Sequence, residues 1–320
     1  MTTPILYMAP MKGFTDYVFR RTFMDHFGGF DLAVAPFIAS KSDDKVKRKF
    51  VRDVLPENNE RMPVVPQILS KSAEDFAFLA DYLFDMGYET VNWNLGCPYP
   101  MVAKKMRGSG MLPHPDMIDE FLDKVLRRMK PRLSIKIRLG YKTSDDIFNL
   151  APILNRYPLA ELIVHPRIAA QRYSGEVDLE AFERCVAEIE HRIVYNGDIK
   201  TLGDFRRLHA RFKTLNGWMI GRWCIADPFL PSAIKNGRNG SGRKIEKIKA
   251  FHLTLFNEYK AVLDGPSHLL NKMKGLWRYL SLPFADFKKS MKKIKKSTSP
   301  ELYLKQVNLF FDCEAKLKVN

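Results

Sequence analysis

A cysteine between glycine and proline is the residue of this chain whose type and setting best suit proton transfer. Cys97 stands in the segment 94–98, which reads Asn-Leu-Gly-Cys-Pro. A free thiol has a pKa of about 8.5, so it is mostly protonated at neutral pH and can donate a proton. As a thiolate it would instead be a nucleophile. A lone cysteine is more often buried and inert, but the flanking glycine and proline indicate a loop and favour a chemical role.

Four polar side chains at the ends of apolar runs match the hydrogen-bonding edge of a flavin ring. They are Gln67, Asn94, Lys136 and His165. Such a ring presents acceptors at N1, O2 and O4 and a donor at N3, and a lysine near N1 stabilises the charge of the reduced ring. Taken singly, Lys136 could form an internal ion pair and His165 could be a satisfied core histidine. As a set, the four residues favour a flavin site.

Two glycine-containing segments suit a phosphate group. Asn196-Gly197-Asp198 follows one apolar run, and Gly221-Arg222 follows the next. Glycine lets backbone N–H groups approach a phosphate, a helix N-terminus adds its dipole, and arginine supplies a charged fork. Both glycines could simply make tight turns. Their place after the last two strands of a barrel, where phosphate often binds, favours a cofactor phosphate.

Eight short apolar runs, most of them separated by amphipathic stretches, must position these residues. The runs are Ile5–Met8, Leu32–Ala35, Val64–Leu69, Thr90–Asn94, Leu133–Ile137, Leu162–Val164, Ile193–Tyr195 and Trp218–Ile220. Alternating strand and helix patterns predict parallel strands, and eight units in residues 1–235 match an α/β fold, the (β/α)8 TIM barrel of about 250 residues. The active site of such a barrel lies at the carboxyl ends of the strands. A doubly wound sheet is the alternative, but no G-x-G-x-x-G follows the first run.

The last quarter of the chain has a different character. Residues 236–244 are rich in glycine and asparagine and are predicted to be a linker. Four helical patterns and no strand pattern follow, so residues 245–320 are predicted to form a small all-α helical bundle domain. Residues 236–320 contain 18 Lys and Arg against 7 Asp and Glu, which is +11 of the formal net charge of +16. Such a module attracts a polyanion, and charge alone leaves nucleic acid and an anionic membrane surface open.

The expected compartment is the cytoplasm. The four cysteines form no C-x-x-C pair and no zinc-type spacing, so we expect neither a disulfide framework nor a metal site. The N-terminus, MTTPILYMAP, lacks the basic segment and apolar core of a signal peptide. No apolar run approaches the roughly 18 residues of a membrane span.

Six motifs resemble those of the tRNA-dihydrouridine synthases and occur in that family's order. They are APMKGFTD (9–16), NLGCP (94–98), KIRLG (136–140), HPRIAAQRYSG (165–175), NGDI (196–199) and MIGR (219–222). The basic helical region corresponds to the family's RNA-binding domain. The resemblance implies a barrel that holds FMN, is reduced by NADPH, and reduces the C5=C6 bond of a uridine in the D-loop of tRNA. We expect a monomer that binds no membrane.

The resemblance also implies roles for individual residues. Cys97 would protonate C5 of uracil while a hydride passes from flavin N5 to C6, and Asn94 would help to hold the uracil. The implied flavin contacts are Ala9, Pro10 and Met11 along the flavin, Gln67, Lys136 and His165 at the isoalloxazine, and Asn196, Gly197, Asp198, Gly221 and Arg222 at the phosphate. Arg167, Arg172 and Tyr173 would lie near the flavin edge or the RNA.

The third helical pattern, at 284–296, separates apolar from basic residues. Its apolar face would hold Phe284, Phe287, Met291 and Ile294, and its basic face Lys288, Lys292, Lys295 and Lys296. A solvated face is the plain alternative, and contact with anionic lipid is another. Beside a barrel that modifies a base, contact with an RNA backbone is favoured, because such contacts offset the cost of unstacking the target.

Three positions depart from the family pattern, and three alternative functions stay open. Asn92 stands where aspartate is usual, Ile168 where threonine is usual, and Trp223 where a small residue is usual. The alternatives are a flavin oxidoreductase on a free pyrimidine, similar to the dihydroorotate dehydrogenases, a dihydrouridine synthase acting on another RNA, and a non-catalytic RNA-binding protein. The basic module argues against the first, and the intact Cys97 and Lys136 argue against the last.

Overall fold

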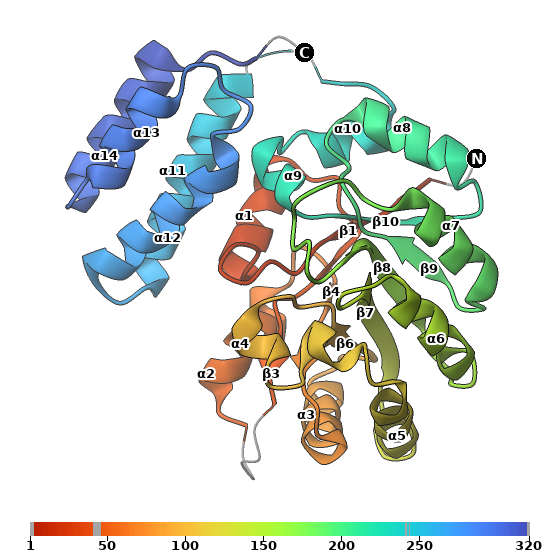
Figure 1. Ribbon diagram of the computed structural model, residues 1–320. Coiled ribbons are helices and arrows are strands. Elements are labelled where there is room, and N and C mark those ends of the chain that lie inside the picture. Colours follow the sequence, from red (N-terminus) through yellow and green to blue (C-terminus); the bar gives the residue numbers. More distant parts are fainter. Residues whose placement is uncertain (1–2, 41–45, 241, 243, 319–320) are drawn as a thin grey trace.

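A barrel of parallel strands forms one part of the molecule, and a group of helices stands beside it (Figure 1). The computed structural model describes residues 3–40, 46–240, 242 and 244–318. Residues 241 and 243, two of those predicted as linker, lie outside this part. No described helix is both long and apolar enough to cross a membrane.

Ten parallel strands curl into one sheet whose two edges meet. The strands are β1 (Ile5–Met8), β2 (Leu32–Val34), β3 (Ile38–Ala39), β4 (Val64–Val65), β5 (Gln67–Leu69), β6 (Thr90–Leu95), β7 (Arg132–Gly140), β8 (Glu161–Ile168), β9 (Ile193–Tyr195) and β10 (Gly217–Ile220). Their order is β3-β5-β6-β7-β8-β9-β10-β1-β2-β4. Pro66 alone separates β4, which pairs with β2, from β5, which pairs with β6, so this one segment joins both edges.

The predicted (β/α)8 barrel and its eight strands are therefore confirmed, with two differences. The run 64–69 is interrupted at Pro66, which has no N–H to donate but whose carbonyl accepts from the Asn92 N–H at 2.8 Å. The short strand β3 was not predicted, because two residues carry no periodicity.

The barrel interior holds a small apolar cluster and, nearer the carboxyl ends of the strands, polar side chains. The cluster consists of Tyr7, Ala9, Val34, Ile163, Val194 and Met219. Because alternate residues of a strand face the same side, Lys136 and Arg138 on β7 point inward together, as do His165 and Arg167 on β8. The polar groups are thereby gathered at one end of the barrel.

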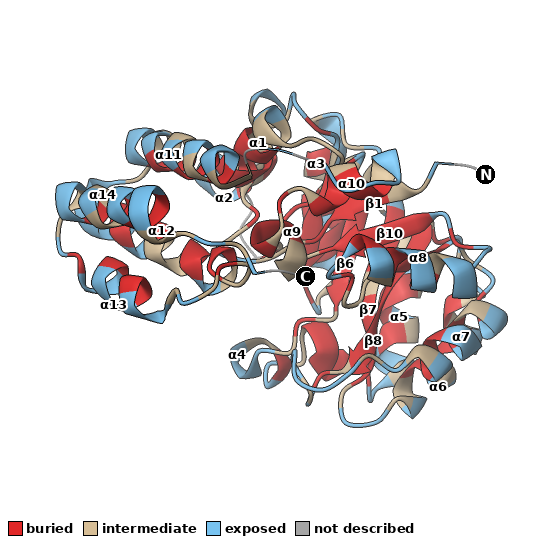
Figure 2. Ribbon diagram, turned by 90° about the horizontal axis from the view of Figure 1, so that it is seen from above, coloured by how far each residue is buried: buried red, intermediate tan, exposed pale blue. Residues whose placement is uncertain are grey.

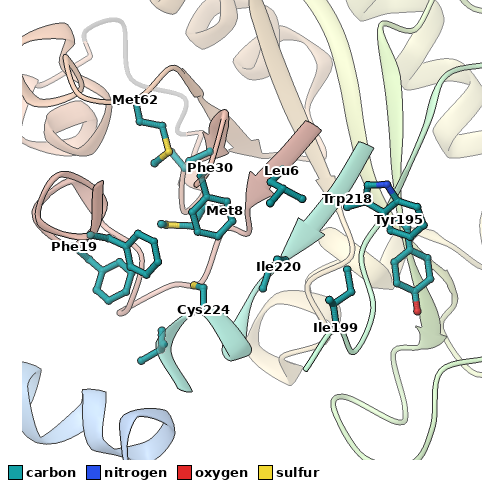
Figure 3. Close-up of a cluster of buried hydrophobic side chains, with 14 of the residues drawn as sticks. Leu6, Met8, Phe19, Phe30, Met62, Tyr195, Ile199, Trp218, Ile220 and Cys224 are labelled. Carbon is teal, nitrogen blue, oxygen red and sulfur yellow. The ribbon is translucent and has the colours of Figure 1, made fainter. Parts of the chain in front are cut away.

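Helices cover the outside of the strands and bury a continuous apolar layer (Figures 2 and 3). They are α1 (Tyr17–His26), α2 (Arg48–Val51), α3 (Ala73–Asp85), α4 (Pro100–Ala103), α5 (Pro115–Leu126), α6 (Asp145–Leu154), α7 (Leu179–Glu188), α8 (Leu202–Arg211), α9 (Arg222–Ala226) and α10 (Leu230–Asn236). Figure 3 shows Met8 of β1 on the side of Phe19 of α1, with Cys224 of α9 nearby. This layer keeps the strand ends, and thus the polar groups, in fixed positions.

Four helices follow the barrel, as the sequence pattern predicts. They are α11 (Lys244–Val262), α12 (Gly265–Leu280), α13 (Lys288–Lys296) and α14 (Pro300–Leu309). The prediction that α13 starts at 284 is wrong. Phe284 instead forms an antiparallel bridge with Leu317, and Asp286 has a left-handed φ of 48°, which a helix cannot contain.

An aromatic seam joins the helical region to the barrel. The ring of Phe251 on α11 lies 5.8 Å from Phe19, 6.1 Å from Phe23 and 5.0 Å from Phe27, measured between centroids. Edge-to-face pairs of this kind add to the area that they bury. The apolar core therefore runs without interruption from the barrel into α11 and α12.

Candidate active site

A cleft opens at the carboxyl ends of the strands and holds about 1000 Å³ of space, part of it open to solvent. Most of the residues predicted as a site line it. They are Ala9, Pro10, Met11, Asn94, Cys97, Lys136, His165, Tyr173, Asn196, Gly197, Asp198, Gly221 and Arg222. The structure thus brings together residues that are more than 200 positions apart in the chain, from Ala9 to Arg222.

The Cys97 loop is held by the side chain of Asn94. Asn94 Oδ1 accepts from the backbone N–H of Gly96 at 3.1 Å and of Cys97 at 2.9 Å. Burial raises the pKa of the Cys97 thiol above its ordinary value, while the Tyr99 backbone N–H and the charge of Arg138 lower it by less. The thiol is therefore protonated at neutral pH.

A chain of amide hydrogen bonds fixes Asn94 in turn. Because Asn94 Oδ1 receives backbone donors, its Nδ2 donates to Gln67 Oε1 at 2.7 Å, and Gln67 Nε2 donates to Asn92 Oδ1 at 2.7 Å. Asn92 Nδ2 then donates to Ser134 Oγ at 2.7 Å. Gln67 is fully buried under the cleft and does not line it. Asn92, which departs from the family pattern, both accepts and donates a hydrogen bond in this chain.

Lys136 faces the cleft with an unpaired amino group. Among the described residues its Nζ has no hydrogen bond and no ion pair, although the residue is half-buried. Burial, with a smaller contribution from the charge of Arg138, lowers the pKa of Lys136 to about 7. An anionic group in the cleft would restore the charged form, so the site suits a ligand with negative character.

His165 is a neutral imidazole whose tautomer is set by Arg167. Burial, followed by the charges of Arg138 and Lys136, lowers the pKa of His165 well below its ordinary value. The Arg167 guanidinium can only donate, so the 3.2 Å contact between Arg167 Nη1 and His165 Nε2 makes Nε2 the acceptor. The ring hydrogen of His165 therefore sits on Nδ1.

Arg167 lies beneath the cleft and does not line it. Its side chain is fully buried, and it pairs with Asp198 at 2.7 Å and donates to the Gly175 carbonyl at 2.6 Å. Asp198 also binds Arg222 at 2.6 Å. Burial raises the pKa of Asp198, but the hydrogen bond and charge of Arg167, with Arg222, outweigh it and hold that pKa below its ordinary value. Arg167, expected near the flavin edge or the RNA, therefore lies behind the cleft lining, where it contacts His165 and Asp198.

The cleft wall at Gly197 has no room for a side chain. A Cβ there would lie 2.2 Å from the Tyr195 hydroxyl, so glycine is required by space. At Gly221 a Cβ would make only ordinary contacts, 3.4 Å from Ala9 Cβ. The backbone at 197, between Asn196 and the Asp198–Arg222 pair, therefore lies directly against Tyr195 and forms part of the cleft lining.

Two predicted sets lie away from the cleft lining. Arg172 is exposed with a left-handed φ of 52° and is not among the lining residues. Lys288, Lys292, Lys295 and Lys296 are exposed on α13, whose buried face is Ser290, Met291 and Ile294. Among the described residues these four lysines form no ion pair, so their charge is available to solvent.

Several lining residues were not assigned to the site from the sequence. They are Lys12, Phe14, Phe37, Gly96, Pro98, Tyr99, Arg138, Trp223 and Tyr279. Arg138 could have been assigned from the sequence, since it lies two positions after Lys136 on the same strand and so faces the same side. Its Nε donates to the Gly96 carbonyl at 2.9 Å. Tyr279 had none, because it reaches the cleft from α12 through an edge contact of 5.1 Å with Phe14.

A tight segment after α4 supports the cysteine loop from behind and was also missed. The Ser109 hydroxyl donates to the Cys97 carbonyl at 2.8 Å. At Gly108, whose φ is 55°, a Cβ would lie 2.9 Å from Cys97 Cβ. The glycine pair in Arg-Gly-Ser-Gly (107–110) was the available signal.

The family model for dihydrouridine synthase (Dus) matches residues 7–312 of the chain. The chain belongs to the dihydrouridine synthase family. The predicted family and the predicted enzyme are thereby confirmed. The match covers the barrel and the helices that follow it, so both parts are features of a dihydrouridine synthase.

Curated relatives agree with this family, and a solved structure agrees with the fold. The chain is 28% identical over 243 residues to a tRNA-dihydrouridine(16) synthase of Cupriavidus necator, covering 74% of this chain and 75% of the relative. It is 26% identical to tRNA-dihydrouridine synthase B of Pasteurella multocida, covering 70% and 67%. Morphinone reductase superposes with a TM-score of 0.53 at 13% identity, over 77% of this chain and 88% of that one, which shows a shared fold.

Proposed function

We propose that this dihydrouridine synthase reduces the C5=C6 bond of a uridine in the D-loop of tRNA, with FMN as cofactor and NADPH as reductant. The names of the relatives, tRNA-dihydrouridine synthases, support tRNA as substrate. The observation that carries the proposal is that one cleft combines the protonated thiol of Cys97 with the unpaired amino group of Lys136, which an anionic ligand would charge.

The residues of the cleft fit FMN. Lys136 and the Nδ1–H of His165 would serve the isoalloxazine edge, and Arg222 with the bare backbone at Gly197 would hold the phosphate. Ala9, Pro10 and Met11 would line the flavin. When bound, the flavin supplies the hydride that adds to C6 of uracil. The chain's own contribution at that end is a fixed positive charge at the edge of the ring.

Cys97 completes the reduction by donating its proton to C5 of the uracil. A thiol whose pKa is raised by burial keeps that proton until the adjacent carbon becomes basic. Asn94 fixes the loop through the N–H groups of Gly96 and Cys97, so the sulfur keeps its place while the substrate enters. Asn94 also lines the cleft, where it would meet the uracil.

The helical region would bind the RNA backbone. Neutralising Lys288, Lys292, Lys295 and Lys296 with glutamine is expected to weaken tRNA binding and to lower the salt slope by about 1 for each lysine that contacts a phosphate. Filter binding over a series of salt concentrations measures both. The same four positions changed to arginine keep the charge and should keep the slope; an unchanged slope in the glutamine variant would remove α13 from the binding surface.

Lys136→Met is expected to slow flavin reduction by about 100-fold and to stabilise the flavin-free protein by roughly 1–3 kcal/mol at pH 7. The folded pKa of about 7 lies below the ordinary value, so the unfolded chain binds more protons between pH 7 and 10. The free energy of unfolding of the wild type should therefore rise with pH in that window, and the variant should lack the rise. Urea unfolding measures this; Lys142→Met, an exposed neighbour, should change neither property.

The proposed function is tested by mass spectrometry of nucleosides from tRNA that lacks dihydrouridine. The purified protein, loaded with FMN and supplied with NADPH, should convert uridine to a nucleoside heavier by two hydrogens. Failure to bind any flavin would refute the proposal. Reoxidation of the flavin by orotate or uracil but not by tRNA would show that the enzyme acts on a free pyrimidine. Conversion of uridine in ribosomal RNA alone would show that ribosomal RNA, and not tRNA, is the substrate.

A further inference from the structure

A second cavity, with about 1020 Å³ of space, lies between the barrel and the helical region. Its barrel side comes from the loop after β9 and from α9 and the turn that follows. Its helical side comes from the first turns of α11, the turn after α12 and the C-terminal tail. Trp223 lines both this cavity and the active-site cleft. Figures 1 and 2 show α9, which carries Trp223, between the barrel and the helices.

Two lysines of this cavity lie over aromatic rings. Lys200 Nζ lies over the Trp223 ring, 5.7 Å from its centroid, and Lys244 Nζ lies over the Phe229 ring at 5.5 Å. Within the described ranges neither ammonium has a hydrogen bond or an ion pair. The one carboxylate in the lining, Asp227, accepts from the Phe229 N–H at 3.2 Å, and the nearby charge of Lys244 lowers its pKa by less than burial raises it. Since Lys200, Lys244 and Lys318 share the lining with this single carboxylate, the cavity favours an anion.

The rest of the wall is apolar and is built by a contact between distant segments. Its apolar members are Trp223, Ala226, Phe229, Ile248, Leu282, Pro283 and Leu317. The tail is held there by Lys318 N–H, which donates to the Pro283 carbonyl at 2.9 Å, and by Lys318 Nζ, which donates to the Leu282 carbonyl at 2.8 Å. Lysines beside aromatic rings, over an apolar wall, are the combination that holds unpaired nucleotides.

We propose that this interdomain cavity binds one unpaired nucleotide of the RNA substrate, its phosphate near Lys200 and Lys244 and its base against the apolar wall. The inference rests on the proposed function, because it takes the polyanion to be the RNA. Since Trp223 separates this cavity from the flavin cleft, the nucleotide held here would fix the RNA beside the site where the uridine reacts.

The test compares binding of tRNA lacking dihydrouridine by FMN-loaded protein and by two kinds of variant. Lys200→Gln with Lys244→Gln should raise the Kd about tenfold and lower the salt slope by about 1. Leu282→Trp fills the cavity without removing a charge and should raise the Kd by a similar factor. Lys213→Gln, an exposed lysine before β10 at the opposite end of the barrel, is the matched control and should bind as the wild type does.

Flavin content and thermal unfolding are measured for every variant, so that loss of folding is not taken for loss of binding. If the wild type binds and modifies tRNA but the lysine variant matches Lys213→Gln, the inference is overturned and the proposed function stands. If the KM for NADPH rises while the Kd for tRNA is unchanged, the cavity serves the free dinucleotide, which also overturns it. If the wild type itself neither binds nor modifies tRNA, the proposed function is refuted, and with it the inference that rests on it.

Discussion

Replacing Cys97 with alanine is expected to slow dihydrouridine formation by about 100- to 10,000-fold while the reduction of bound flavin by NADPH continues. The thiol lies in the cleft proposed to hold the uracil, and burial keeps it protonated. The NADPH half-reaction needs no proton at C5. Stopped-flow absorbance separates the two steps, because loss of flavin absorbance reports the first and its return on adding tRNA reports the second.

Two other cysteine variants make this result specific. Cys97→Ser keeps the shape of the side chain, but a serine hydroxyl holds its proton far more tightly than a thiol does. This variant should therefore resemble the alanine variant. Cys313→Ala, at an exposed free cysteine of the helical region, should behave as the wild type does. Equal rates of flavin reoxidation in Cys97→Ala and wild type would show that the proton comes from elsewhere.

Asp198→Ala is expected to lower the free energy of unfolding by about 3–5 kcal/mol, because it leaves the buried guanidinium of Arg167 without its anion. Arg167 has a fully buried side chain, and Asp198 is its only carboxylate among the described residues. The variant also frees Arg222, so it should lose FMN. Urea unfolding of the flavin-free protein isolates the effect on stability.

An exposed ion pair provides the comparison. Asp123→Ala removes the partner of Arg127, which is 76% exposed, and should cost no more than about 0.5 kcal/mol. Adding Arg167→Leu to Asp198→Ala should recover part of the loss, because the unpaired charge is then gone. A cost for Asp198→Ala as small as that for Asp123→Ala would show that solvent reaches Arg167.

The fold could be predicted where the apolar periodicity of the sequence persists. The prediction failed where an element depends on pairing with a segment that is distant in the sequence. All eight strands follow from short β-branched runs, yet β7 continues to Gly140 although the apolar run ends at Ile137. Its continuation depends on β8, with which Arg138 and Gly140 pair. The start of α13 was misplaced because the partner of Phe284, Leu317, lies at the other end of the helical region.

The candidate site could be predicted only for the residues whose position follows from the strand pattern. Cys97, Lys136 and His165 line the cleft, and each lies at or just after the end of one of the apolar runs read from the sequence, a rule that needs only the pattern. The burial of Arg167 was not predictable, since its partner Asp198 comes from the next strand. Tyr279 was equally hidden, because its place depends on how α12 packs against the barrel.

The aromatic seam between α1 and α11 has a consequence for how a large substrate is chosen. Since Phe251 packs among Phe19, Phe23 and Phe27, the helical region is held in one position against the barrel. A helical region in a fixed position cannot close around RNAs of different shapes, so an RNA must already match the space between the two parts. A barrel cut off at residue 236 would expose those rings to water and self-associate.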